Sequence, residues 1–263
     1  MIATDVRLAP TLETMASVYL LSRDGGNKSE RFNTFVARVE HEWGLVAYNP
    51  MAGTSAQETV QALLALDAEN VALNAARNVA ALCSYFDPVT LAISVRSTGL
   101  WTDRVGTEID DRLSTKMKIG FGIISLWSRE EHTHDDVVRE SIAETVRVMW
   151  HAMHGAADTL NRILAREGLA YALAGRAAPW SRYNSAPTTE ESVVVMEAIE
   201  VLGETRAAGE IAGVLFGDDA ATTMGWTPLG VPDRAGYRWA VVRAEHQWKD
   251  VGPAAALREN VSA

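Results

Sequence analysis

Carboxylate and imidazole groups suited to metal binding recur along one predicted helix. Glu144, His151 and His154 fall on the same face of that helix, and two histidines three positions apart are close enough to share a metal ion. Helical bundles build metal sites from such a stripe. The spacing suggests a metal-dependent enzyme, a hydrolase or an oxidoreductase, to which His132 and His41 would add ligands from other segments.

The same stretch also fits a purely structural role. This stripe lacks the Glu-x-x-His spacing of di-iron bundles, and a charged face opposite an apolar one is ordinarily solvated. The segment before it, "SREEHTHDD", places acidic residues where a helix start favours them. Ser128 with Glu131, or Thr133 with Asp136, would form a capping box there. A divalent metal therefore belongs to the alternative hypothesis, and the leading one expects no cofactor.

Tryptophans next to arginines suggest a binding pocket. Four of the eight tryptophans are followed directly by Ser or Thr. An apolar residue before a Ser or Thr N-cap is typical of a hydrophobic staple, so one hypothesis is that these tryptophans anchor helix starts. The other is that three of them line a pocket for an anionic or aromatic ligand. The pocket residues would be Trp101, Arg104, Trp127, Arg129, Trp180 and Arg182.

Two further segments resemble binding motifs. In "RDGGNKSER", Lys28 and Ser29 follow two glycines at a predicted helix start, as in an anion-binding turn, although the spacing of a P-loop is missing. Residues 209 to 226 faintly resemble a helix-turn-helix. No Lys or Arg occurs between residues 207 and 233, and DNA-reading helices need such donors. Nucleic acid is therefore not an expected partner.

A short sequence occurs twice, as "VARVEHEW" at 36–43 and "VVRAEHQW" at 241–248. The residues sharing a helix face with the histidine differ between the two copies, so we interpret the recurrence as similar amphipathic packing. We expect Trp43 and Trp248 to be substantially buried, and His41 to be more exposed than His246. We also expect the two histidines to lie apart and to share no metal.

The elements that would position these residues are mostly helices. Apolar periodicity and capping residues predict helices over about 11–22, 29–43, 55–67, 69–84, 156–173 and 188–202. A further long helix is predicted to begin between residues 128 and 134 and to end near 154. Residues 89–96 and 119–127 fit strand or helix equally well, and Asp87–Pro88 resembles a helix start. The predicted fold is mainly α, a multi-helix bundle-like body with room for one or two short strands. A body of residues 1–178 and a smaller C-terminal helical subdomain of residues 188–263 are expected, either separate or packed as one domain.

Composition limits the functional classes. The 263 residues are 48% hydrophobic with a net charge of −10, which suits a sizeable core and an acidic surface that repels polyanions. Cys83 is the only cysteine, and the N-terminus lacks the pattern of a secretory signal. No apolar run is long enough for a membrane helix. We expect a soluble, cytoplasmic binding or interaction protein whose partner is a protein or a small molecule. The sequence leaves open whether it is an enzyme.

Overall fold

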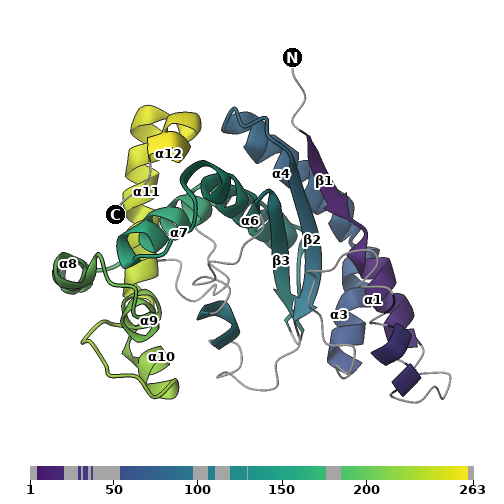
Figure 1. Cartoon of the computed structure of the whole chain (residues 1–263), viewed down its shortest axis with the longest axis horizontal. Coiled ribbons are helices and arrows are strands. Elements are labelled where there is room, and N and C mark those ends of the chain that lie inside the picture. Colours follow the sequence, from purple (N-terminus) through teal and green to yellow (C-terminus); the bar gives the residue numbers. More distant parts are fainter. Residues whose placement is uncertain are drawn as a thin grey trace.

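The chain folds into a mainly α-helical protein with a small parallel β-sheet (Figure 1). The computed structural model describes residues 5–20, 29, 30, 32–34, 37, 54–96, 106–109, 119–128, 130–175 and 185–259. The first part contains β1 (Val6–Ala9), α1 (Thr11–Leu20), α3 (Thr54–Ala65), α4 (Ala68–Leu82), β2 (Val89–Arg96), β3 (Phe121–Trp127) and α6 (His134–His154). The second contains α7 (Leu160–Ala174), α8 (Thr189–Leu202), α9 (Ala208–Phe216), α10 (Asp218–Thr223), α11 (Ala235–Val251) and α12 (Pro253–Glu259).

Three parallel strands form the sheet, in the order β1-β2-β3. Both segments that the sequence left open are strands, and β1 is a third strand that the sequence analysis did not predict. The helix start expected at Asp87–Pro88 is wrong, because Val89 begins β2 instead. Strand β2 is central in the sheet and pairs with β1 on one side and with β3 on the other. Tertiary pairing with β1 and β3 thus overrides the local capping pattern.

The two faces of the sheet differ in chemistry. On one face Leu91, Ile93 and Ile124 are fully or almost fully buried in the main hydrophobic core. On the other, Ala9 and Ala92 form a small separate cluster with Phe121. Because side chains alternate along a strand, the residues that share this second face include the polar side chains of β2 and β3.

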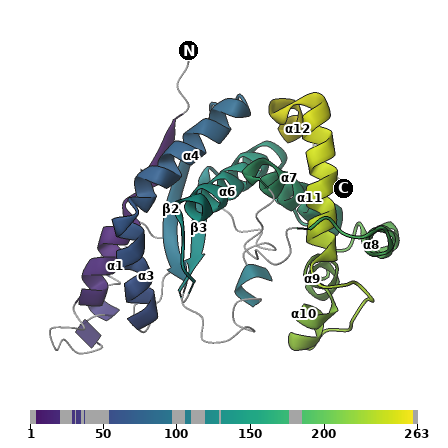
Figure 2. The ribbon, with the colours of Figure 1, turned by 180° about the vertical axis from the view of Figure 1, so that it is seen from behind.

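Helix α6 runs through the middle of the molecule. It packs against α4, α7 and β3, and Figures 1 and 2 show it between the sheet and α7. Thr133 caps it in a capping box with Asp136, which confirms one of the two predicted starts. The solvated face predicted for this helix is wrong, because Glu144, Arg147 and His151 are all buried.

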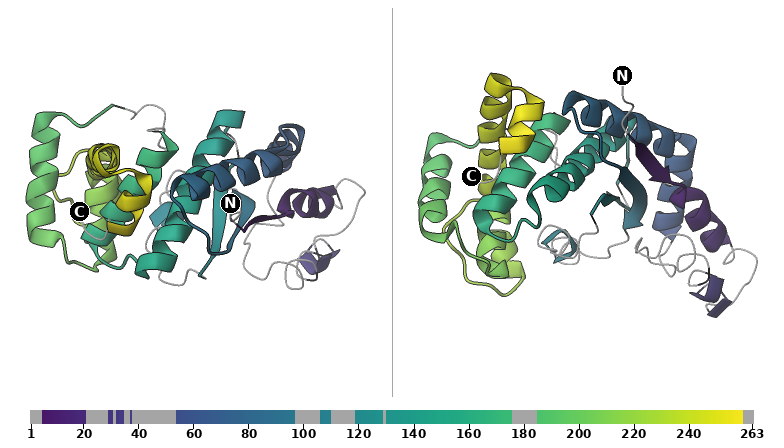
Figure 3. Two further views of the ribbon diagram at one scale, coloured as in Figure 1. Left: turned by 90° about the horizontal axis from the view of Figure 1, so that it is seen from above. Right: turned by 45° about the horizontal axis from the view of Figure 1, so that its top comes forward.

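The C-terminal helices pack closely around α11. A Cβ atom at Gly168 of α7 would lie 2.5 Å from the carbonyl oxygen of Ala240, so only glycine permits this approach of α7 to α11. Helix α8 begins with the predicted capping box of Thr188 and Glu191 and ends at Leu202 as expected. It lies at the outer edge of the molecule (Figure 3).

Buried side chains from both predicted parts, such as Leu63 and Phe216, belong to one main core. The division near residues 178–188 stays a prediction. Among the helices of the described residues, none combines the length and the apolar character needed to cross a membrane.

Candidate functional site

Polar side chains gather at the carboxyl ends of β2 and β3. In the parallel register Ser94 lies beside Ser125, and Arg96 lies beside Trp127. The Nε atom of Arg96 donates a hydrogen bond to the Ser125 hydroxyl at 3.3 Å. Parallel strands covered on both faces usually carry near-continuous apolar residues, so this polar end departs from the norm. In open α/β sheets, ligands bind outside the carboxyl ends of the strands.

Ser128, the residue after β3, adds a further polar group at this end. Its backbone N–H donates to the carbonyl of Arg96 at 2.8 Å, which extends the pairing of β3 with β2 by one residue. Its side chain is buried, and the hydroxyl has no hydrogen-bond partner among the described residues. A buried hydroxyl without a partner costs free energy, so this position suits a group that accepts or donates a hydrogen bond to it.

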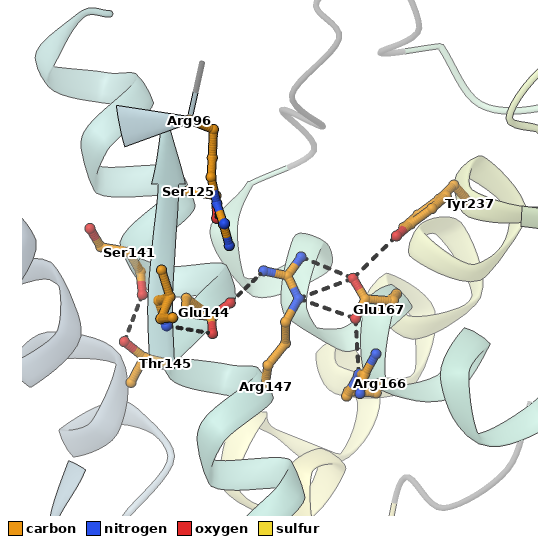
Figure 4. A network of polar contacts seen from close by, with 10 residues as sticks. Arg96, Ser125, Ser141, Glu144, Thr145, Arg147, Arg166, Glu167 and Tyr237 are labelled. Carbon is orange, nitrogen blue, oxygen red and sulfur yellow. Dashed lines mark hydrogen bonds and ion pairs between the residues drawn. The ribbon is translucent and has the colours of Figure 1, made fainter. Parts of the chain in front are cut away.

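A buried ion-pair network lies next to this end of the sheet, between β3, α6 and α7 (Figure 4). One oxygen of Glu144 accepts from the backbone N–H of Ile123 at 3.1 Å. Because β3 lies at the edge of the sheet among the described strands, this bond satisfies an N–H group that points away from β2. The other oxygen accepts from Nη1 of Arg147 at 3.1 Å. Helix α6 can approach so closely because Gly122 has no side chain.

Glu167 of α7 is the centre of the network. Its carboxylate accepts from Nη2 of Arg147 at 2.9 Å, from Nε of Arg166 at 2.9 Å and from the hydroxyl of Tyr237 at 3.4 Å. Glu167 is fully buried, and both arginines are 2% exposed. The guanidinium of Arg147 also lies 5.0 Å from the ring centre of Tyr171. Ion pairs join α6 to α7, and the hydroxyl of Tyr237 links α11 to the same carboxylate.

The charge of Arg147 is fixed by these neighbours. Burial alone lowers the pKa of its guanidinium, but the nearby Glu167, Tyr171 and Glu144 raise the pKa well above its ordinary value. A group in this state neither donates nor accepts a proton during a reaction near neutral pH. We therefore interpret the network as a rigid support for the end of the sheet.

Two of the predicted metal ligands hydrogen-bond to backbone carbonyls. His154 bonds through Nε2 to the carbonyl of Leu257 at 2.7 Å, and His132 bonds through Nε2 to the carbonyl of Trp127 at 2.9 Å. His151 is buried, whereas His41 lies outside the described residues. Within the described ranges, no three His, Cys, Asp or Glu side chains gather in a way that would hold a metal.

Only one member of the predicted tryptophan–arginine pocket can be placed. Trp127 is the last residue of β3 and is 5% exposed. The Ser128 capping box predicted after it is wrong, because α6 begins six residues later at His134 with Thr133 as its cap. The other five members, Trp101, Arg104, Arg129, Trp180 and Arg182, lie outside the described residues. In the sequence, Trp101 and Arg104 follow β2, and Arg129 follows β3.

The other sequence-predicted positions are resolved in part. Lys28 lies outside the described residues and Ser29 is exposed. The segment compared with a helix-turn-helix does form two short helices, α9 and α10, which meet at Gly217. It contains no basic side chain.

The second copy of the repeated stretch lies on α11, whereas His41 and Trp43 of the first copy lie outside the described residues. Trp248 packs, partly buried, against the main core. His246 is exposed and its neighbour Glu245 is buried. The expectation that His41 is more exposed than His246 stays a prediction, because His41 is not described. Helix α11 packs against α7. Its small residues, such as Ala240 and Ala244, are buried and determine which face of the helix packs inward.

Sequence reasoning missed Arg96, Glu167 and Tyr237. One available signal was the pair Arg166–Glu167, which interrupts the otherwise apolar segment "ILAREGLAYALA". Charged residues are almost never fully buried unless they are paired, so their place in that segment indicates a buried ion pair.

Comparison with known proteins adds no relative: no family model, no curated protein and no solved structure matches this chain.

Proposed function

We propose that this protein binds a small anionic molecule at the carboxyl ends of β2 and β3. The observation that supports this most directly is the register of Arg96 beside Trp127 on the same face of a parallel sheet. An arginine recognises carboxylate or phosphate through paired hydrogen bonds, and the buried indole of Trp127 is its apolar neighbour in the sheet. The buried hydroxyl of Ser128 supplies a further hydrogen-bonding group.

The sequence around this end of the sheet agrees with an anionic ligand. Although the whole chain has a net charge of −10, arginines 104 and 129 follow β2 and β3 in the sequence. The ion-pair network behind the strands ties α6 to α7 and would hold the site in one geometry. Preorganisation of this kind reduces the entropy that binding costs. We keep the expected cytoplasmic location, because the single cysteine, Cys83, is a buried thiol.

Thermal unfolding with defined anions tests the proposal. The purified protein would be heated with inorganic phosphate, citrate or AMP, each over a wide concentration range. A ligand that binds only the folded state stabilises it by about 2.7 kcal/mol at a hundred times its dissociation constant. We expect at least one of the three to raise the melting temperature in a saturable way, beyond the effect of sodium chloride at equal ionic strength. Equal effects of all salts would contradict the proposal.

The alternative function, a metal-dependent enzyme, rests on Glu144, His151 and His154. Both oxygens of Glu144 already accept hydrogen bonds, and His154 bonds to a backbone carbonyl. We therefore expect no stoichiometric divalent metal in protein purified without a histidine tag. Elemental analysis that found one metal ion per chain would reverse this preference.

A further inference from the structure

Helix α8 exposes large apolar side chains along one face. Val193, Met196 and Val201 are 42%, 49% and 80% exposed. At about 100° per residue, they lie on the side opposite Val195 and Leu202, which face the main core. Single exposed apolar residues are normal on a protein surface, but several along one helix face mark an interaction surface.

The exposed face does not result from a loosely attached helix. At its start, Arg238 of α11 makes hydrogen bonds to both carboxylate oxygens of Glu191, at 3.1 and 2.6 Å. At its end, Asn161 of α7 donates to Glu204 at 3.0 Å. Val195, in the middle, is fully buried. Helix α8 is thus fixed at both ends and in the centre, and it presents a preformed surface.

Acidic residues lie among the apolar side chains: at about 100° per residue, Glu197 falls between Val193 and Val201 on the helix face. Glu190, Glu197, Glu200 and Glu204 are all exposed, and no Lys or Arg occurs between residues 189 and 205. Negative charges beside an apolar stripe would repel nucleic acid and acidic surfaces. The complementary surface carries apolar residues with lysines or arginines around them.

We propose that the outward face of α8 binds a basic amphipathic helix of another protein. Val193, Met196 and Val201 would contact the apolar stripe of that helix, and Glu197 and Glu200 would pair with its basic residues. Helices bind helices by packing such stripes together. This surface is separate from the carboxyl ends of β2 and β3, and the inference does not depend on the anionic ligand proposed there.

A designed peptide pair tests this inference. The probe is a synthetic helix of leucine and lysine, three to four turns long with amphipathic spacing, and its control has glutamate in place of every lysine. We expect the lysine peptide to bind at least about tenfold more tightly than the glutamate peptide in fluorescence anisotropy. The double variant Glu197→Lys/Glu200→Lys should also bind the lysine peptide about tenfold more weakly than the wild type does.

A matched control separates this surface from the overall negative charge. Glu13 and Glu58 are exposed glutamates on α1 and α3, so Glu13→Lys/Glu58→Lys changes the net charge equally at a different place. The inference requires that this control bind the lysine peptide like the wild type. It is overturned if both double variants weaken binding equally, or if the two peptides bind alike.

Apolar variants complete the test. Met196→Ser/Val201→Ser should melt like the wild type, because both side chains are exposed, and should lose affinity for the lysine peptide. Unchanged affinity would overturn the inference. So would a wild-type dimer in sedimentation that this variant abolishes, because the occupant of the surface would then be a second copy of the chain.

Discussion

Replacing Glu167 with glutamine removes the negative charge at the centre of the buried network while nearly preserving its shape. In the wild type, two carboxylates, of Glu144 and Glu167, face two guanidiniums, of Arg147 and Arg166. After Glu167→Gln, one carboxylate faces the two guanidiniums, which leaves one positive charge in excess among these four positions. Breaking a buried pair by removing one partner costs about 3–5 kcal/mol.

This loss is large compared with the stability of a folded protein, which is typically about 5–15 kcal/mol. Urea unfolding followed by circular dichroism would measure it as a lower midpoint. The exposed Glu58 offers a matched control, since Glu58→Gln should change stability by less than about 0.5 kcal/mol. If Glu167→Gln lowers the free energy of unfolding by less than about 1 kcal/mol, the network does not hold α6 and α7 together.

A double-mutant cycle identifies the partner. Arg147 donates three hydrogen bonds to Glu167, so Arg147→Met should be destabilising alone. The two substitutions together should lower the free energy of unfolding by less than the sum of their separate effects. The expected coupling lies at the upper end of the usual range of about 0.5–3 kcal/mol. Additive costs would show that the two side chains act independently.

Two other substitutions probe separate parts of the molecule. Gly168→Ala should destabilise by about 1–3 kcal/mol in urea unfolding, because the new Cβ meets the backbone of Ala240; a gain in stability, as expected from helix propensity alone, would contradict the close packing. Trp127→Ala should lower the free energy of unfolding by about 3–5 kcal/mol, since the indole is 5% exposed. A variant that melts like the wild type would show that this indole adds little to stability.

Burial raises the pKa of the Cys83 thiol from 9.0 to about 11, so at pH 8 about a hundredfold less thiolate is present than in the unfolded chain. Folded protein should therefore react with a disulfide reagent far more slowly than protein in urea, and the contribution of Cys83 to stability should fall as pH rises from 9 to 11. Equal reaction rates would contradict its burial.

Capping residues predicted a helix start correctly where a side chain and a backbone N–H group of the same turn bond to each other. Thr188 with Glu191 and Thr133 with Asp136 form the expected capping boxes, because both partners lie within four residues of each other. Ser128 with Glu131 has the same pattern but follows a strand directly, and there the pairing of Ser128 with Arg96 prevails. A capping pattern thus predicts a helix start only where no strand pairing competes.

The sheet and the candidate site could not be predicted from local sequence, because their residues interact with partners far away in the chain. Residues 89–96 became a strand because β1 and β3 flank them, and the four residues of β1 are too few to show an alternating pattern. The face of α6 with Glu144 and Arg147 looked solvated because its partner, Glu167, lies 20 residues beyond Arg147. Periodicity along one helix does not reveal a complementary charge on another.

The most direct test of the proposed function compares two arginines on the same sheet. Arg96 ends β2 at the carboxyl end, whereas Arg7 of β1 pairs with Thr90 near the amino end and is exposed. Isothermal titration with phosphate, citrate and AMP would be carried out on the wild type, Arg96→Gln and Arg7→Gln. A charged hydrogen bond contributes about 1.5–3 kcal/mol, so Arg96→Gln should weaken binding by at least about tenfold while Arg7→Gln leaves it unchanged. If Arg96→Gln binds as tightly as the wild type, or if none of the three anions binds the wild type, the carboxyl end of this sheet is not the anion site.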